Sequence, residues 1–316
     1  MLLRQAARNG IICPVGESSM AKVIDTSNGA KIGYALGGGG ARGLSHIGVM
    51  KVLEQHGIHP DVIAGTSIGA LVGALYASGL RAGDIERALR LDLRRLALLA
   101  DVRLSLSGLV QGKRVTSALK SFLGDLTFSD LKIPFACVAT DIVHGRQVVL
   151  RTGPVITAVR ASISVPGIFT PVKVRGRYLV DGGLVNMVPV STCREMGAEY
   201  VIGVNVIPDP AGMFHAPENE EDEDDEQDLN VRQPRSKRSR TPKSSAPNVV
   251  KVLIQSLYIP GYRIAMENLE AADLAISPEV GNIGFFQFDK EVEAIEAGEK
   301  AARMALEEAG LDIRVG

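Results

Sequence analysis

Short apolar runs, glycine turns and longer repeats of apolar and polar positions alternate along the first quarter of the chain. Residues 32–36, Ile-Gly-Tyr-Ala-Leu, predict a short buried strand, residues 37–43 a turn, and residues 44–56 a helix. The same order returns at once, with a strand over 62–64, a tight turn, and a helix of small residues over 70–78. Two successive strand, turn and helix units predict a parallel sheet.

Further apolar runs predict that the sheet continues through the middle of the chain. Residues 84–122 are expected to be helical but less regular, and residues 190–196 to form a helix that Gly197 ends. Additional strands are predicted over residues 135–140, 147–151, 178–180 and 200–206. The helix over 190–196 and the strand after it complete a third unit of the same kind.

Two helices are predicted near the end of the sequence. The first is apolar, covers residues 249–259, and is expected to end at Pro260-Gly261. The second covers residues 289–310 and is expected to bury one face formed by Val292, Ile295, Ala302 and Leu306. Both are expected to pack back on the sheet.

Charge is concentrated in one segment between these parts. Nine Asp or Glu residues lie between positions 218 and 228, six Lys or Arg residues follow between 232 and 243, and almost nothing apolar separates them. Such a composition buries too little apolar surface to fold, so we predict a disordered insertion over 210–247. It would divide a single domain made of residues 30–209 and 248–316. Residues 1–29 are expected to be a disordered leader, with Met20 as an alternative translation start to Met1.

Composition narrows the class of protein only a little. The 316 residues are 46% hydrophobic and 22% charged, which is typical of a globular α/β protein, and the net charge of -1 gives no overall attraction to nucleic acid. The cysteines, Cys13, Cys137 and Cys193, are an odd number without metal-ligand spacing. With no signal peptide or membrane span in the pattern, these features predict a cytoplasmic protein without a metal or cofactor.

A Gly-x-Ser-x-Gly sequence lies in the second predicted turn. Gly65 and Gly69 flank Ser67, a strand ends before the motif, and a helix begins after it. Small flanking residues allow the sharp turn that holds a nucleophilic serine at the edge of a sheet. A buried turn serine would show the same short pattern, so the motif needs support from other residues.

The glycine run over residues 37–43 lies in the first predicted turn. Its backbone N–H groups at a helix N-terminus can hold negative charge, either a phosphate or a developing oxyanion. Gly38, Gly40 and Gly43 also have the spacing of a dinucleotide-binding loop, with Asp61 about 20 residues further on. Against that interpretation, Asp61 precedes its strand instead of following it. A purely structural turn is the third reading.

A nucleophilic serine needs a base, and Asp181 is the candidate with the best position. None of the five histidines follows a strand in a place typical of a catalytic triad, whereas Asp181 ends a predicted strand and is followed by Gly182 and Gly183. An ordinary Asp-Gly turn explains this segment alone. Together with Ser67, however, Asp181 predicts a Ser-Asp dyad at one sheet edge.

These segments, in this order, resemble the patatin-like phospholipase family. The resemblance rests on Gly-Gly-Gly-Gly-Ala-Arg-Gly, Gly-Thr-Ser-Ile-Gly and Asp-Gly-Gly, and on the stretch from Arg160 to Val172 between the last two. It runs over residues 30–209 and 248–310.

The resemblance implies a three-layer α/β/α fold with a central, mostly parallel sheet, and metal-free hydrolysis of lipid esters. It implies that Ser67 is the nucleophile and Asp181 its base, and that the amides of Gly38, Gly39 and Gly40 form the oxyanion hole. The motif positions Arg42, Gly43, Gly65, Gly69, Gly182 and Gly183 would support them. Arg42 would steady the glycine loop, meet a phosphate headgroup or form a structural salt bridge.

The partners that follow are a lipid or ester substrate and a peripheral membrane contact, and no nucleic acid. Residues 96–110 and 249–259 are apolar enough for such a contact, although core or dimer packing explains them equally well. A homo-oligomer stays open. The competing functions are a nucleotide- or phosphate-binding protein that uses the glycine loop, and a catalytically silent scaffold of the same fold.

Overall fold

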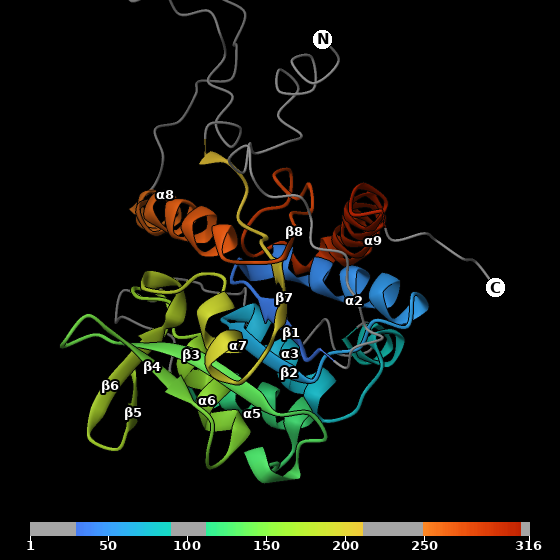
Figure 1. The fold of residues 1–316 in the computed structure, drawn as a ribbon. Helices are drawn as coiled ribbons and strands as arrows, with labels where there is room; N and C mark the ends of the chain where they lie inside the picture. The colour runs from blue at the N-terminus through green and yellow to red at the C-terminus, as the bar shows by residue number, and fades with distance from the viewer. Residues whose placement is uncertain (1–29, 90–111, 211–248, 311–316) are drawn as a thin grey trace, which may run out of the picture.

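The computed structural model describes residues 30–89, 112–210 and 249–310, and they form one sheet with helices packed against it (Figure 1). The sheet has eight strands in the order β5-β6-β3-β2-β1-β7-β8, with β4 also paired to β3. In chain order the strands are β1 (Ile32–Leu36), β2 (Val62–Thr66), β3 (Phe135–Asp141), β4 (Arg146–Leu150), β5 (Val172–Val174), β6 (Arg177–Asp181), β7 (Tyr200–Val204) and β8 (Leu274–Ile276).

The central strands are parallel, and an antiparallel edge extends them. β3, β2, β1, β7 and β8 run in one direction. β4 and β6 pair with β3 in the opposite direction, and β5 pairs with β6. Because β2 and β7 lie on opposite sides of β1, the loop after β1 opens at a topological switch point, where ligands of α/β sheets bind.

Alternating side chains of the strands enter two separate cores. In β1, Ile32, Tyr34 and Leu36 belong to one apolar cluster, whereas Ala35 belongs to the other. This alternation is expected of a strand with helices on both faces. The prediction of an α/β/α fold with a central, mostly parallel sheet is therefore confirmed.

The helices divide between these faces. The helices are α2 (Ser45–Gln55), α3 (Ile68–Ala77), α5 (Gly112–Leu123), α6 (Val155–Ser162), α7 (Val190–Glu195), α8 (Val249–Glu270) and α9 (Glu291–Glu308). Side chains of α2, α3, α6 and α9 pack in the first cluster, and those of α7 and of the second half of α8 in the other. None of the described helices is long and apolar enough to cross a membrane.

Helices α2 and α9 approach each other to backbone contact. A Cβ added to Gly48 of α2 would lie 1.9 Å from the carbonyl oxygen of Ile295, and one added to Gly298 of α9 would lie 2.0 Å from that of Ser45. Only glycine permits this distance. The helix that follows the glycine loop is therefore held directly by α9.

The prediction that Pro260 ends the helix before it is wrong. α8 passes through Pro260 and continues to Glu270. Proline removes one backbone hydrogen bond and disfavours a helix interior. The second half of α8 compensates because Ala265 and Leu269 are buried against the second core.

The predicted buried face of the last helix also needs a correction. Val292 is 44% exposed, whereas Ala294, Ile295, Gly298, Ala302 and Leu306 are buried. Because α9 packs closely on α2, the small residues of α9 face α2 and Val292 does not. The predicted leader, the charged insertion and residues 96–110 lie outside the described residues.

Candidate active site

Ser67 occupies a sharp turn between β2 and α3. Its backbone angles, φ 54° and ψ -123°, lie in a region of φ and ψ in which residues other than glycine are strained. A Cβ on Gly65 would come within 2.5 Å of the carbonyl oxygen of Gly69, and one on Gly69 within 2.2 Å of that of Leu36. The two glycines therefore permit the turn, and the strained serine is held at the sheet edge as in a nucleophile elbow.

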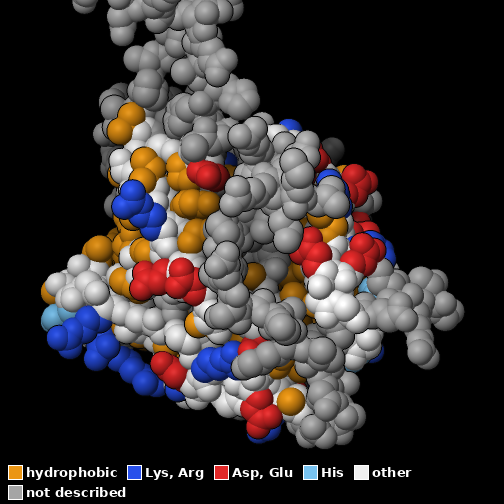
Figure 2. Space-filling view, turned by 45° about the horizontal axis from the view of Figure 1, so that its top comes forward, with side chains coloured by type: hydrophobic (Ala, Val, Ile, Leu, Met, Phe, Trp, Pro, Cys, Tyr) orange, Lys and Arg blue, Asp and Glu red, His pale blue; other side chains and the backbone are white. Residues whose placement is uncertain are grey.

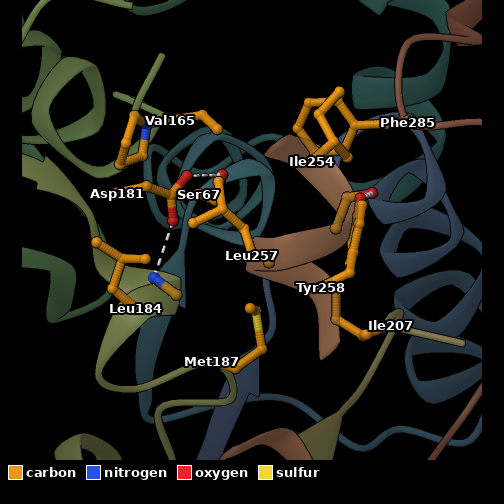
Figure 3. Close-up of a pocket in the computed structure, with 14 residues that line it drawn as sticks. Ser67, Val165, Asp181, Leu184, Met187, Ile207, Ile254, Leu257, Tyr258 and Phe285 are labelled. Carbon is orange, nitrogen blue, oxygen red and sulfur yellow. Dashed lines mark hydrogen bonds between the residues drawn. The ribbon is translucent and has the colours of Figure 1, made fainter. Parts of the chain in front are cut away.

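The hydroxyl of Ser67 meets the carboxylate of Asp181. Ser67 Oγ donates a 2.6 Å hydrogen bond to Asp181 Oδ2, and the amide of Gly183 donates a 2.8 Å bond to Oδ1 (Figure 3). Both side chains are buried, with Ser67 7% and Asp181 8% exposed. Burial raises the pKa of Asp181 to about 6, although the bonds from Ser67 and Gly183 favour the ionised form.

Asp181 is fixed by its neighbours in the sheet. It pairs with Ala139 of β3, its amide donates to the carbonyl of Ser164, and its own carbonyl accepts from the hydroxyl of Thr140. A Cβ on Gly182 would lie 2.4 Å from the carbonyl oxygen of Val138. The glycine after Asp181 thus lets the chain turn tightly against β3 and aim the carboxylate at Ser67.

The glycine loop after β1 lies beside Ser67, as the parallel register of β1 and β2 requires. Its amides differ in their partners. The Gly38 amide donates 3.1 Å to the carbonyl of Met187, whereas the amides of Gly39 and Gly40 have no acceptor among the described residues. Gly40 has φ 62°. Of the three amides expected to bind an oxyanion, those of Gly39 and Gly40 therefore have no acceptor in the described parts of the chain, and that of Gly38 is occupied.

His46 supports this loop from behind. Its Nε2 lies 2.8 Å from the carbonyl oxygen of Gly37, and the ring is fully buried. Burial lowers the pKa of His46 to about 4, so the ring is neutral at physiological pH and Nε2 carries the proton that it donates. None of the histidines in the described residues lines the pocket; His215 lies outside them.

Arg42 acts on the loop from its other end. Its Nε donates to the carbonyl of Ile283, and its guanidinium lies over the ring of Tyr258 at 5.0 Å. The side chain is 2% exposed and forms no salt bridge with a described carboxylate. Gly43 packs on Ile68, where a Cβ would come within 2.1 Å. Of the roles expected for Arg42, steadying the loop is the one with observed contacts.

Ser162 at the end of α6 holds the amide of Ser67, and sequence reasoning did not assign it a role. Ser67 N donates 2.8 Å to Ser162 Oγ, which donates 2.6 Å to the carbonyl of Val138. Ser162 is fully buried. A serine in a helix of ordinary composition carries no signal of such a contact, because its partner is 95 positions away.

A mostly apolar pocket opens next to Ser67 and Asp181 (Figure 3). Its empty volume is about 480 Å³, part of it open to solvent, within the range of small-molecule sites. The polar side chains that line it are Ser67, Asp181 and Tyr258; the remaining lining residues are Gly38, Gly39, Val165, Pro166, Gly183, Leu184, Met187, Ile207, Ile254, Leu257 and Phe285.

The dinucleotide interpretation of the glycine loop has no support here. Asp61 lies at the start of β2, at the opposite edge of the sheet, where its carboxylate accepts a 2.7 Å hydrogen bond from the amide of Ile32. It cannot reach a ligand bound at the loop. The pocket beside the loop is apolar, which does not suit a pyrophosphate.

Fold and site together define an α/β protein with a serine elbow, a facing carboxylate and a glycine loop at a topological switch point. The sequence profile of the patatin-like phospholipases matches residues 34–194, about half of the chain and the part that holds all three elements. The chain belongs to the patatin-like phospholipase family.

Individual proteins are similar to this chain over part of its length. An uncharacterised NTE family protein of Mycobacterium tuberculosis is 36% identical over 186 residues, which cover 59% of this chain and 52% of that protein. Lysophospholipase NTE1 of Meyerozyma guilliermondii is 34% identical over 280 residues, 82% of this chain and 19% of that protein. Among solved structures, VipD from Legionella pneumophila matches with a TM-score of 0.43 and 16% identity over 55% of this chain and 50% of that one. The matched region spans about half the length of the mycobacterial relative.

Proposed function

We propose that this protein is a lipid acyl hydrolase that cleaves carboxylic ester bonds with Ser67 as nucleophile and Asp181 as base. The observation that carries the proposal is the 2.6 Å hydrogen bond from a strained, buried serine to a carboxylate whose pKa burial raises to about 6. A base with a pKa near the working pH combines a useful deprotonated fraction with proton affinity.

Acylation begins with the proton of Ser67. Asp181 Oδ2 accepts it while Oγ attacks the ester carbonyl, and the carbonyl oxygen takes the negative charge. The amides of Gly39 and Gly40 would stabilise this oxyanion. The amide of Gly38 would join them once its hydrogen bond to the carbonyl of Met187 is broken. Asp181 then returns the proton to the leaving alkoxide, and the acyl group stays on Ser67.

Deacylation repeats these steps with water. Asp181 accepts a proton from the water, whose oxygen attacks the acyl carbonyl, and the same amides hold the second oxyanion. Collapse of this intermediate releases the fatty acid, and the proton on Asp181 returns to Ser67 Oγ. The dyad therefore ends the cycle in its starting state.

The pocket and the relatives favour a lipid as substrate. The apolar lining from the loop after α6, from α8 and from the loop at Phe285 suits an acyl chain, and the carbonyl would lie between Ser67 and the glycine loop. A relative carries the name lysophospholipase. The free, buried thiols of Cys137 and Cys193 are compatible with a reducing compartment, so we extend the proposal to a cytoplasmic protein that meets lipid at a membrane.

A fluorophosphonate probe and a series of esters test this proposal. We expect the probe to label the wild type. Asp181→Asn should lose hydrolysis, and Ser67→Ala should lose both labelling and hydrolysis. Ser129→Ala, at an exposed position, is the matched control and should keep both activities. A folded wild type that is neither labelled nor active on lysophospholipid, phospholipid or p-nitrophenyl esters would favour the scaffold interpretation instead.

A further inference from the structure

Two neighbouring hairpins at one edge of the sheet form a strongly basic surface. They are the β3–β4 turn with β4, and the β5–β6 hairpin. Residues 142–151 and 172–178 contain no Asp or Glu, and their five Lys and Arg side chains are exposed: Arg146, Arg151, Lys173, Arg175 and Arg177. We call these five side chains the basic hairpin surface. Figure 2 shows blue side chains gathered at the lower left of the molecule, the side on which Figure 1 places β4 to β6. A chain with a net charge of -1 thus concentrates positive charge locally.

Only Arg177 among these five residues has an acidic partner in the described part of the protein. Arg177 Nε lies 4.0 Å from Asp141 Oδ2, but that carboxylate is buried and already bonded to His144 at 2.9 Å. Arg175 donates to the hydroxyl of Thr152, which carries no charge. Within the described residues, Arg146, Arg151 and Lys173 form no salt bridge. The surface therefore keeps a net positive potential toward solvent.

Large apolar side chains are exposed among these charges. Ile142 is 47%, Val143 67% and Tyr178 48% exposed. The amide of Ile142 donates to the carbonyl of Tyr178, which joins the two hairpins, and Lys173 lies over the Tyr178 ring at 5.4 Å. Basic, apolar and aromatic side chains in this mixture suit the interface of a bilayer. There basic groups contact the lipid phosphates, and apolar and aromatic groups lie at the boundary with the acyl chains.

Arg175 occupies a position that disfavours it. Val174 pairs with Arg177, so Arg175 and Gly176 form a two-residue hairpin turn, in which Arg175 has φ 48°. Such turns favour Asn-Gly because both central residues need a positive φ. An arginine there is strained, which indicates that its charge serves a purpose other than the fold of the turn.

The β3–β4 turn of this surface lies at the same edge of the sheet as the candidate active site, whereas Arg151 follows Leu150, which pairs with Cys137 below the level of Ser67. β3 is parallel to β2, with Val138 paired to Thr66, so the turn after Asp141 projects beyond the level of Ser67. Tyr178 precedes Asp181 by three residues of β6, roughly 10 Å along the strand. On the other side of the pocket, α8 exposes Val252, Leu253 and Ile259 next to the lining residues Ile254 and Leu257.

We propose that the basic hairpin surface docks the protein on an anionic phospholipid bilayer, with Ile142 and Val143 entering the headgroup region. The basic side chains contact lipid phosphates, and the pocket between the hairpins and α8 faces the membrane. Docking as such stands on the hairpins alone; its purpose, delivery of lipid to Ser67, rests on the proposed function.

Vesicle cosedimentation of the full chain tests the docking. We would use Ser67→Ala as background, to keep the lipid intact, and compare phosphatidylcholine vesicles with vesicles that also contain phosphatidylglycerol. Arg175→Asn should weaken binding to the anionic vesicles about fivefold, since each basic residue near an anionic membrane contributes about 1 kcal/mol of binding free energy. The turn itself should become more stable. Adding Lys173→Gln and Arg177→Gln should weaken binding on the order of 100-fold.

Lys300→Gln is the matched control, because Lys300 is 66% exposed on α9, away from the hairpins. It should change vesicle binding less than twofold. The six basic residues between 232 and 243 are present in every variant, so differences among variants report the hairpins. Equal vesicle binding by Arg175→Asn, the triple variant and Lys300→Gln would overturn the proposal. So would loss of binding to duplex DNA in the triple variant with vesicle binding unchanged.

Hydrolysis separates this inference from the proposed function. With Ser67 present, the triple variant should cleave a water-soluble p-nitrophenyl ester like the wild type, yet lose activity on vesicle lipid. If neither the wild type nor any variant cleaves the soluble ester, but vesicle binding weakens as hairpin charges are removed, the proposed function fails and the docking stands. If vesicle binding ignores the charges while the ester is cleaved, the docking fails alone.

Discussion

Ser67 Oγ and Asp181 Oδ2 are 2.6 Å apart although 114 positions separate the two residues in the sequence. One follows β2 and the other ends β6, and both strands pair with the side of β3 that β4 leaves free. Because the carboxylate must be ionised to accept the serine proton, its pKa of about 6 predicts the pH dependence of the reaction. We expect kcat/KM to fall below about pH 6, approaching tenfold per pH unit. A pH–rate profile on a soluble ester checks this, and an acid limb centred near pH 4 would contradict it.

Asp181→Asn should stabilise the protein at high pH. Folded Asp181 holds its proton up to about pH 6, whereas the unfolded residue releases it near 3.8. The folded state binds more protons between these values, so the free energy of unfolding falls as pH rises through the window. The shift of about two pKa units corresponds to about 3 kcal/mol.

Denaturant unfolding of wild type and Asp181→Asn at two pH values measures this effect. Asparagine keeps the shape of the side chain and can still accept from Gly183. The variant should gain up to about 3 kcal/mol at pH 8 and almost nothing at pH 3.5. An equal difference at both pH values would assign the gain to another cause.

His46 predicts a pH effect of opposite sign. Burial lowers the pKa of His46 from 6.5 to about 4, so the unfolded chain binds an additional proton between these values. The free energy of unfolding should therefore fall as pH drops from 6.5 to 4, by about 3 kcal/mol from this residue. Comparing wild type with His46→Asn isolates the contribution, since the variant should lack it. Parallel pH curves for the two proteins would show that His46 is not kept neutral by the fold.

Ser162 is predicted to position Ser67 without taking part in the reaction. Ser162→Ala leaves the buried amide of Ser67 without its acceptor, which should cost about 1–3 kcal/mol of stability. The elbow should also lose alignment, so kcat should fall between about tenfold and about 100-fold while KM changes little. The acid limb of the pH–rate profile should stay near pH 6, since Asp181 is untouched. A displaced limb would mean that Ser162 acts on the carboxylate.

Strong local patterns predicted much of this fold, and long-range contacts decided the rest. The strands β1, β2 and β7 are predicted because continuous apolar runs between turn residues are typical of strands buried on both faces. β5 and β8 have three residues each and were not predicted, since so short a run has no period. The helix α6 and the passage of α8 through Pro260 were missed because tertiary packing, which a local pattern does not contain, stabilises them.

The candidate site shows the same division. Glycine and serine spacing predicted that Ser67 meets the glycine loop, because the parallel strands β1 and β2 bring their carboxyl ends together. Asp181 ends β6, which runs antiparallel to β3, so its approach to Ser67 does not follow from parallel strands. The hydrogen bond that engages the Gly38 amide with Met187, and the support of Ser67 by Ser162, depend on side chains and carbonyls from distant loops. The spacing and composition of the sequence do not predict either hydrogen bond.

The close backbone approach of α2 and α9, which Gly48 and Gly298 permit, has a consequence for the order in which the protein is made. Both dyad residues and the glycine loop are synthesised before α9, so the helix that follows the loop lacks its packing surface until residue 298 has been made. A chain interrupted before that point carries every reactive group and leaves one face of α2 open to water. The candidate dyad and the glycine loop therefore gain the support of α9 only after all of their own residues have been synthesised.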